Sequence, residues 1–124
     1  DFPVAKPACV IAGGETTVTL RGGGKGGRNQ EMALAFMAAL GRSPKDGERL
    51  TFLSAGTDGN DGPTEAAGAV VSLGLYRSAV AAGLDPEAAL ADNDSNGFFR
   101  KAGGLVVTGP TNTNVCDVQV LIVT

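Results

Sequence analysis

A glycine-rich stretch at residues 21–31 (RGGGKGGRNQE) constrains this chain more than any other segment. Five glycines occupy the six positions 22–27, with Lys25 among them and Arg28 directly after them. Glycine adopts positive φ without steric cost and lets a ligand approach the backbone, but it loses more entropy on folding than any other residue. So many glycines together indicate that backbone N–H groups face a partner.

The flanking segments predict that this stretch is a loop between a strand and a helix. Residues 16–21 are rich in β-branched side chains and favour a strand. Residues 29–40 are strong helix formers, with Asn29 as the expected N-cap. A helix N-terminus close to Lys25 and Arg28 favours the binding of an anion. The alternative is a mobile surface turn whose cations are only solvated.

The spacing of the glycines does not identify the anion. Gly22, Gly24 and Gly27 satisfy the dinucleotide fingerprint G-x-G-x-x-G, but the acidic residue expected about 20 positions later is missing. The phosphate-loop pattern also fails, because Thr19 stands where its first glycine belongs and Gly26 follows the lysine. Neither nucleotide motif is therefore predicted.

Composition excludes several classes of function. The chain has 124 residues, a net charge of −3 and a pI of about 4.8, so we expect no nucleic acid and no anionic membrane as a partner. No apolar run approaches the ~20 residues of a membrane span, and we expect a cytoplasmic protein. Histidine is absent, which excludes Ser-His-Asp catalysis and histidine–metal chemistry within this chain.

Apolar runs at both ends of the chain predict buried strands. Residues 8–12 (ACVIA) are wholly apolar, so this strand is expected to be buried on both faces. Cys9 and Cys116 lie in such runs. We interpret them as buried small hydrophobes with free thiols, rather than as a disulfide or a zinc site.

The alternation of strand and helix signals predicts an α/β fold. Residues 1–7 are interpreted as a linker or boundary segment, and residues 8–124 as one domain. The expected strands are 8–12, 16–21, 50–55, 67–72, 105–108 and 115–123, and the expected helices are 29–40, 75–82, 86–91 and 95–102. We expect three layers, α/β/α, around a mixed, mostly parallel sheet. Loop 109–114 is too short for a helical crossover, which predicts an antiparallel C-terminal strand pair.

A second glycine-containing loop, residues 56–65, carries Asp58, Asp61 and Glu65. Carboxylates on such a loop suit Mg²⁺, or could orient a hydroxyl or a nucleophile. The calcium-loop pattern fails because Gly62 stands where a third oxygen ligand belongs. A tight turn held by Asp and Asn side chains is an equally good interpretation.

Two further polar segments have both a binding and a structural interpretation. Residues 108–114 include Thr111 and Asn114, which could contact hydroxyl or phosphate groups, although the segment could also be a plain hairpin turn. Residues 93–95 (NDS) are most simply a helix cap.

Together these segments resemble the MOFRL domain, the C-terminal domain of the bacterial glycerate 2-kinase family. The segments that carry the resemblance are 13–19 (GGETTVT), 26–31 (GGRNQE), 56–64 (GTDGNDGPT), 93–95 (NDS) and 108–115 (TGPTNTNV). They cover nearly the whole chain after Pro7, in the family's order. One departure is Asn112, which stands where glycine is common in the family.

The resemblance implies phosphorylation of D-glycerate by ATP with Mg²⁺, at a cleft between this domain and a larger N-terminal α/β domain of the same polypeptide. Arg28 would grip a phosphate or carboxylate bidentately, and Asp58 and Asp61 would bind the metal or orient the attacking hydroxyl. The other residues expected to bind substrate or phosphate are Gly24, Lys25, Gly26, Gly27, Asn29, Glu31, Thr57, Thr111 and Asn114. The isolated domain would be inactive.

Two alternatives remain beside the kinase. Family members have often been labelled hydroxypyruvate reductases, which would make this an NAD(P)H-dependent oxidoreductase. The residues argue against hydride transfer here, because the chain has no Rossmann acid at the right distance and no obvious acid to protonate a ketone. The other alternative is a module that binds a small anion without catalysis.

Overall fold

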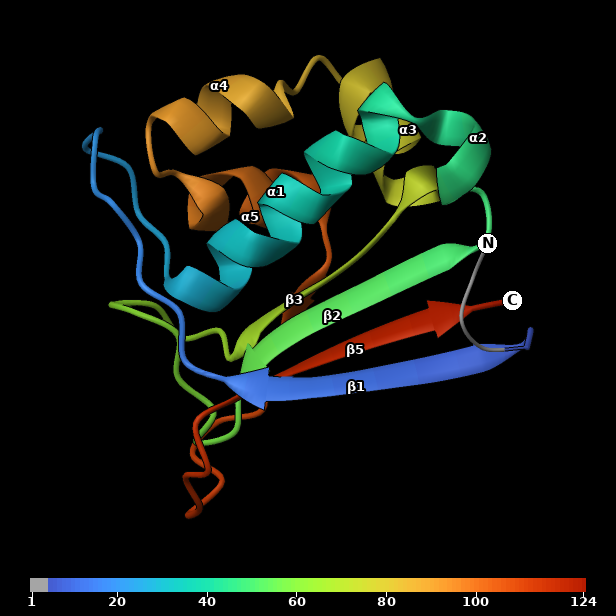
Figure 1. The fold of residues 1–124 in the computed structure, drawn as a ribbon. Coiled ribbons are helices and arrows are strands. Elements are labelled where there is room, and N and C mark those ends of the chain that lie inside the picture. Colours follow the sequence, from blue (N-terminus) through green and yellow to red (C-terminus); the bar gives the residue numbers. More distant parts are fainter. Residues whose placement is uncertain (1–4) are drawn as a thin grey trace.

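One β-sheet carries the strands of the described chain, and helices cover one of its faces (Figure 1). The computed structural model describes residues 5–124. In chain order the elements are β1 (Ala8–Gly14), α1 (Arg28–Arg42), α2 (Pro44–Gly47), β2 (Leu50–Gly56), β3 (Gly68–Ser72), α3 (Leu73–Ala81), α4 (Pro86–Ala91), α5 (Ser95–Ala102), β4 (Leu105–Val106) and β5 (Asp117–Val123). The order across the sheet is β1-β5-β2-β3-β4, and each neighbouring pair is antiparallel.

The prediction of a mostly parallel sheet is wrong. Residues 57–67 join β2 to β3 without a helix, so β3 returns beside β2 and runs antiparallel to it. β1 and β2 run in the same direction, but β5 lies between them and pairs antiparallel with both. The insertion of the last strand removes the parallel neighbours that the alternation of strands and helices predicted.

The prediction that the last two strands pair with each other is also wrong. β4 pairs with β3, where Val106 lies opposite Gly68, whereas β5 lies on the far side of β2 and β3. Residues 107–116 cross the end of the sheet between them (Figure 1). A short loop rules out a helical crossover, but it can still pass along the end of two intervening strands.

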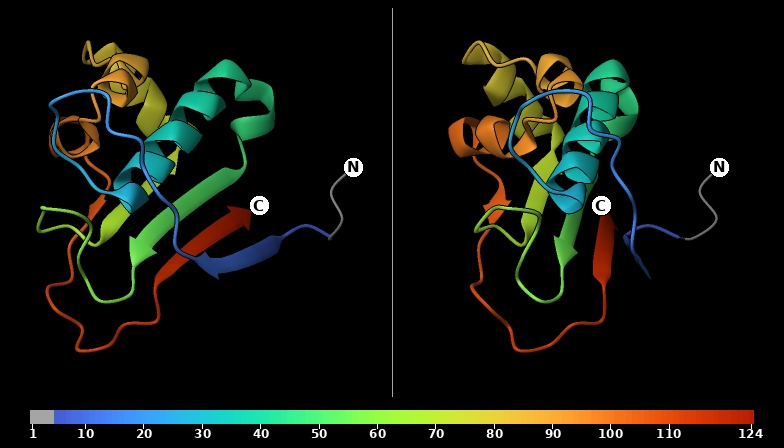
Figure 2. Two further views of the ribbon diagram at one scale, coloured as in Figure 1. Left: turned by 60° about the vertical axis from the view of Figure 1, so that its left-hand side comes forward. Right: turned by 90° about the vertical axis from the view of Figure 1, so that its left-hand side faces the viewer.

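All helices of the described residues lie on one side of the sheet, so two layers replace the predicted three (Figures 1 and 2). α1 packs across β2 and β3 and buries Leu34 and Met37 completely. Phe36 of α1 stacks on Phe52 of β2, with ring centroids 4.3 Å apart. The core therefore lies between α1 and the middle of the sheet.

The boundaries of α1 differ from the prediction at both ends. The helix begins at Arg28 with Gly27 at the N-cap position, so Asn29 lies in the first turn and the prediction of Asn29 as the N-cap is wrong. Gly41 lies within the helix, which was expected to end at residue 40. A Cβ at Gly41 would lie 2.2 Å from the ring of Tyr76, so this glycine admits a packed aromatic side chain.

Residues 16–21 form no strand, against the prediction. The chain leaves the sheet after Gly14, which has a φ of 141°, and continues as extended coil towards the N-terminus of α1 (Figure 2). β-branched residues favour an extended backbone, but a strand also needs a neighbour with which to pair. Residues 5–7 have no regular secondary structure, and residues 1–4 of the predicted linker or boundary segment lie outside the described residues.

Strand β1 is an edge strand with mostly exposed side chains, so its predicted burial on both faces is wrong. It pairs with β5 and does not lie beneath the helices (Figure 1). Cys9 and Cys116 are exposed, also against the prediction, although both are free thiols as expected. The apolar sequence of β1 is thus without cover in this structure.

The other elements lie close to where the sequence predicts them. β2, β3, α4 and α5 begin and end within two residues of the expected positions. Asp85 caps α4 by accepting hydrogen bonds from the N–H groups of Glu87 and Ala88. Among the helices of residues 5–124, none is long and apolar enough to cross a membrane.

Candidate functional site

One end of the sheet gathers the segments that were singled out from the sequence. The last residues of β1 and β2, Gly14 and Gly56, both lie opposite Asp117, the first residue of β5. The loops 15–27, 57–67 and 107–116 therefore all meet at this end, where α1 also begins (Figures 1 and 2). The rest of the site follows from what these loops place around the N-terminus of α1.

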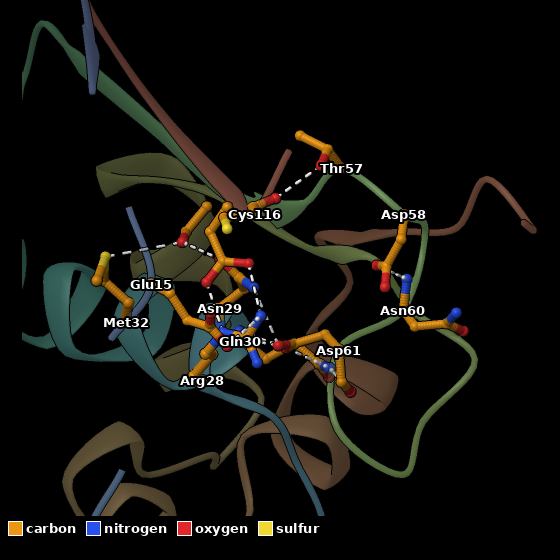
Figure 3. Close-up of polar contacts among 12 residues, drawn as sticks. Glu15, Arg28, Asn29, Gln30, Met32, Thr57, Asp58, Asn60, Asp61 and Cys116 are labelled. Atoms are coloured by element: carbon orange, nitrogen blue, oxygen red, sulfur yellow. Dashed lines mark hydrogen bonds and ion pairs between the residues drawn. The ribbon is translucent and has the colours of Figure 1, made fainter. Parts of the chain in front are cut away.

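Asp61 caps α1 from the second loop (Figure 3). Its Oδ1 accepts hydrogen bonds from the backbone N–H of Asn29 at 2.9 Å and from the Asn29 side chain at 3.2 Å. Its Oδ2 accepts them from the backbone N–H of Gln30 at 2.8 Å and from the Gln30 side chain at 2.9 Å. Asp61 thus supplies, from 32 residues away, the cap that Gly27 cannot provide.

The two amide side chains beside Asp61 continue a buried polar network. Ser54 donates to Asn29 Oδ1 at 2.8 Å, and Asn96 donates to Gln30 Oε1 at 2.9 Å. Asn29, Gln30, Ser54 and Asn96 are each at most 3% exposed. A fully bonded buried network of this kind holds its members in one arrangement, so the N-terminus of α1 is rigidly placed.

Arg28 forms a bidentate ion pair with Asp117. Its Nε lies 2.5 Å from Asp117 Oδ2 and its Nη2 lies 2.9 Å from Oδ1, while Glu15 lies 3.4 Å from Nη2. Burial raises the pKa of the Asp117 carboxyl, but hydrogen bonds from Arg28 and Asn29 outweigh it and hold this pKa below its ordinary value. The hydrogen bond to Asp117 in turn raises the pKa of Arg28.

The first half of the glycine stretch binds another part of the chain, not a ligand. The N–H groups of Arg21 and Gly22 donate to Asn93 Oδ1, that of Gly24 donates to the carbonyl of Asp92, and that of Lys25 donates to Asp94. A Cβ at Gly24 would lie 2.3 Å from the Cβ of Asp94. These glycines therefore allow two backbones to pack closely, and most of these amides are not available to an anion.

The second half of the stretch is different. The N–H groups of Gly26, Gly27 and Arg28 have no hydrogen-bond partner within residues 5–124. Ser95 lies under Gly26, close enough that a Cβ there would be 2.2 Å from Ser95 Oγ. Among the buried polar side-chain atoms of residues 5–124, this hydroxyl oxygen is the one without a hydrogen-bond partner. Unpaired donors are thus concentrated where α1 begins.

These donors border a pocket of about 420 Å³, within the range of small-molecule sites. It is lined by Thr16, Thr17, Val18, Leu20, Gly24, Gly26, Gly27, Arg28, Glu31, Gly62, Asn93 and Ser95. Five of these residues, Gly24, Gly26, Gly27, Arg28 and Glu31, are among the predicted site residues. The extended segment 16–20 forms the opposite wall. We take this pocket as the candidate site.

Four other predicted residues do not line the pocket. Thr57 donates to the carbonyl of Cys116, and Thr111 donates to the carbonyl of Thr57, so these hydroxyls tie the second and third loops together. Asn114 accepts a hydrogen bond from the N–H of Cys116. Asp58, the fourth, lies on the same loop as Thr57. These residues stabilise the loops at the end of the sheet beside the pocket.

Two more predicted site residues, Lys25 and Asn29, also lie beside the pocket without lining it. Lys25 is exposed, while Asn29 is buried in the network with Asp61. Asn112, the departure from the family pattern, has a φ of 60°. Asparagine tolerates this left-handed conformation better than most residues do, which is why the loop accepts it where glycine is common.

The two aspartates predicted to hold Mg²⁺ have different surroundings. Both oxygens of Asp61 already accept two hydrogen bonds each, so its contacts favour the structural interpretation of this residue. Asp58 accepts one, from the N–H of Asn60 at 2.9 Å through Oδ1. Residues 5–124 contain no group of three or more Asp, Glu, His or Cys side chains that could hold a metal.

Sequence reasoning missed two residues of this region, Asp117 and Ser95. Asp117 is the one charged residue in the apolar run 115–123, and a lone charge in a predicted buried strand is a sign that it has a partner. Ser95 was interpreted only as part of a helix cap. No local pattern distinguishes a capping serine from one that lies under a glycine loop.

Comparisons with known proteins point to one family. A model of the MOFRL family matches residues 8–117. The chain is 55% identical to a glycerate kinase from Macaca fascicularis over 93% of this chain and 30% of that protein. It is 49% identical to a D-glycerate 2-kinase from Thermotoga maritima over 94% of this chain and 27% of that protein.

Solved structures give the same result. The chain superposes on the crystal structure of a Thermotoga maritima glycerate kinase with a TM-score of 0.91 and 46% identity, covering 98% of this chain and 28% of that one. A protein from Pyrococcus horikoshii gives a TM-score of 0.88 and 41% identity, with 98% and 27% covered. This chain thus spans about a quarter of the length of the relatives that it matches.

Proposed function

Because this chain belongs to the MOFRL family, we propose that it is the C-terminal domain of a glycerate kinase that transfers the γ-phosphoryl group of ATP to D-glycerate. The observation that carries the proposal is the identity of 49–55% to glycerate kinases over nearly the whole of this chain. The chain spans only a quarter to a third of these enzymes. We therefore place the active site in a cleft between this domain and a larger N-terminal one.

The pocket at the N-terminus of α1 is suited to an anionic group of the substrates. The N–H groups of Gly26, Gly27 and Arg28 have no hydrogen-bond partner within the described residues and lie at the start of α1, where partial positive charge attracts anions. Phosphoryl transfer depends mainly on positioning and on neutralisation of charge. These three donors would bind either the carboxylate of glycerate or a phosphate of ATP.

Arg28 would supply the charged contact. Asp117 and Glu15 hold its Nε and Nη2, while Nη1 has no partner within the described residues and the side chain is 32% exposed. A guanidinium held in this way loses little entropy when it binds an anion. The carboxylates of Asp117 and Glu15 also weaken the attraction between Arg28 and an anion. The contribution of Arg28 therefore depends more on the fixed position of its guanidinium than on the net charge around it.

The chain's own contribution to a metal is limited to Asp58. Mg²⁺ is often bound by one or two carboxylates together with substrate phosphates and water, so the uncommitted oxygen of Asp58 would suit one coordination position. The remaining ligands would come from ATP and the larger domain. We assign Asp61 to the support of α1 rather than to the metal.

The reductase alternative has no specific support in this chain. Dinucleotides bind at the crevice of an open, mostly parallel sheet with a glycine fingerprint at its first turn. The sheet here is antiparallel, and two of the three glycines that match that fingerprint, Gly22 and Gly24, pack against residues 92–94. We therefore keep the kinase as the proposed function and use the reductase as a contrast in its test.

The test measures ADP release by the longer polypeptide that contains this domain, with glycerate and ATP, beside NADH oxidation with hydroxypyruvate. We expect glycerate-dependent ADP release and no NADH oxidation. Arg28→Ala should lower turnover by roughly 10²-fold or more, because a charge-assisted contact to the reacting groups is lost.

Arg28→Lys is the matched variant. It keeps the positive charge but loses the fork that Asp117 orients, so it should recover only part of the turnover. Both variants must first be shown to be folded, since Arg28→Ala leaves the buried Asp117 without its partner. NADH-dependent reduction without ADP release, or normal kinase turnover of a folded Arg28→Ala variant, would contradict the proposal.

A further inference from the structure

The face of the sheet that points away from the helices is mostly apolar and carries no charged side chain within the strands; its polar side chains are Thr51 and Ser72, in the row of Cys9 and Ile122. Antiparallel register places Ile11, Val120, Leu53 and Val70 in one row across β1, β5, β2 and β3. The helix-side residues Phe52 and Val71 belong to the core, so the residues that alternate with them face the other way. We call the side chains of Cys9, Ile11, Leu53, Val70, Val118, Val120 and Ile122 the open face.

The open face is exposed in this chain. Ile11 is 69% exposed, Ile122 is 43% exposed and Val70 is 36% exposed. Figures 1 and 2 show no helix on this side of the sheet. An antiparallel sheet with one solvated face normally alternates apolar and polar residues, with the polar ones in water. A continuous exposed apolar surface of this kind is typical of an interface.

The sequence of β1 supports the same conclusion independently. Its residues are apolar on both sides: Ile11 lies on the open face and Val10, 41% exposed, lies on the helix side. Such a pattern predicts a strand with cover on both faces. No element of the described chain packs on either face of β1, because this strand lies beyond the edge of the helical layer.

We propose that the open face is the docking surface for the part of the enzyme outside this chain, whose apolar face completes a third layer on the sheet. This rests on the proposed function in one respect, that the chain works as part of a longer enzyme. The relatives are more than three times as long as the matched region, since it covers 23–30% of them. A large body of polypeptide is therefore available as the partner.

The connection to that polypeptide favours it over a second copy of this chain. The family match begins at residue 8, the first residue of β1, so a preceding domain would be attached directly beside the open face. A short flexible tether gives an effective concentration in the millimolar range, which favours the attached domain over a separate copy of this chain. The surface of the partner is expected to be apolar, because the open face offers no charge to compensate a buried one.

Cys9 reports on this contact, because its thiol is exposed in this chain and lies on the open face. The experiment labels the longer polypeptide with a thiol reagent, follows the Cys9 peptide by mass spectrometry and normalises the rate to the denatured protein. We expect Cys9 to react at least about tenfold more slowly than in the 124-residue chain, at every protein concentration, because the contact is intramolecular.

A pair of variants gives a second readout in the same polypeptide. Ile11→Asp should lower its melting temperature strongly, since a charge would be placed in a dry contact. The control is Val80→Asp, which also replaces an exposed apolar residue, 45% exposed, but on α3 in the helical layer. In the 124-residue chain, where both positions are exposed, the two variants should behave alike.

Three results would overturn the inference. Cys9 that reacts equally fast in both proteins would show that the face is open in the enzyme. Protection that disappears on dilution would assign the face to a second copy. Equal effects of the two variants in the longer polypeptide would also contradict it. Glycerate-dependent ADP release, measured on the same sample, separates failure of this inference from failure of the proposed function.

Discussion

The two halves of the glycine stretch look alike in sequence but do different things in the structure. Residues 21–25 donate their backbone N–H groups to residues 92–94, and the glycines there allow two backbones to touch. Residues 26–28 have no such partners and border the pocket. The comparison teaches that a run of glycines can have two separate physical reasons, close packing and access for a ligand. Only the second half supports an anion site.

The largest expected effect on stability comes from removing Asp61, which caps α1 and thereby holds residues 26–28 in place. Asp61→Ala leaves buried N–H groups of Asn29 and Gln30 without an acceptor, so it should destabilise the domain by about 3 kcal/mol or more. Urea unfolding measures this. The control is Asp58→Ala on the same loop, which removes one exposed hydrogen bond and should cost under about 1 kcal/mol. Equal losses would show that Asp61 is not a structural cap.

The next largest effect on stability tests whether the glycines of residues 21–25 serve close packing or loop flexibility. Gly24→Ala places a methyl group 2.3 Å from the Cβ and 2.6 Å from the Cα of Asp94, and we expect a loss of about 1–3 kcal/mol. Gly23→Ala is the matched control, since nothing lies within 4 Å of a Cβ there. It should change stability by less than about 0.5 kcal/mol. Thermal or urea unfolding that fails to distinguish them would contradict the packing interpretation.

Asp117 should make stability depend on pH in the acidic range. Its pKa in the folded domain is below the unfolded value of about 3.8. The stabilisation is therefore fully present above about pH 4–5 and is lost as the pH falls through the lower, folded pKa. Asp117→Asn should cost about 1–2 kcal/mol at pH 7.

The difference between wild type and Asp117→Asn should shrink as the pH is lowered below about 4, because protonation then removes the same charge in the wild type. Urea unfolding at pH 7, 5, 4 and 3 provides the comparison. A difference that stays constant over this range would show that the ion pair with Arg28 does not control the acid stability of the domain.

The smallest effect tests the difference between the halves directly. Phosphate or glycerate should slow hydrogen exchange at Gly26, Gly27 and Arg28, because a ligand would occupy their N–H groups. Exchange at Gly22 and Gly24 should not change, because those groups are already bonded. The longer polypeptide is the sample, observed by NMR or by mass spectrometry of short peptides. Equal slowing of hydrogen exchange in residues 21–25 and 26–28 would contradict the conclusion that only residues 26–28 bind an anion.

Much of the local structure could be predicted from the sequence, because its causes are local. The apolar pattern and good helix formers of residues 29–40 predict α1, and Asp85 before Pro86 predicts the start of α4. β2 and β3 follow from short β-branched and apolar runs. The glycine, threonine and acidic segments that resemble the MOFRL domain could also be recognised, because they lie in order along the chain. These features depend on neighbours within a few residues.

The tertiary structure alone decided how these pieces meet. The sequence holds no signal that β5 would insert between β1 and β2, since strand order depends on pairings between distant segments. The pairing of Arg28 with Asp117, 89 residues apart, and the capping of α1 by Asp61 have the same origin. The apolar sequence of β1 is an instructive case. It predicted burial on two faces, and this chain by itself leaves both exposed because burial requires a partner that one segment cannot specify.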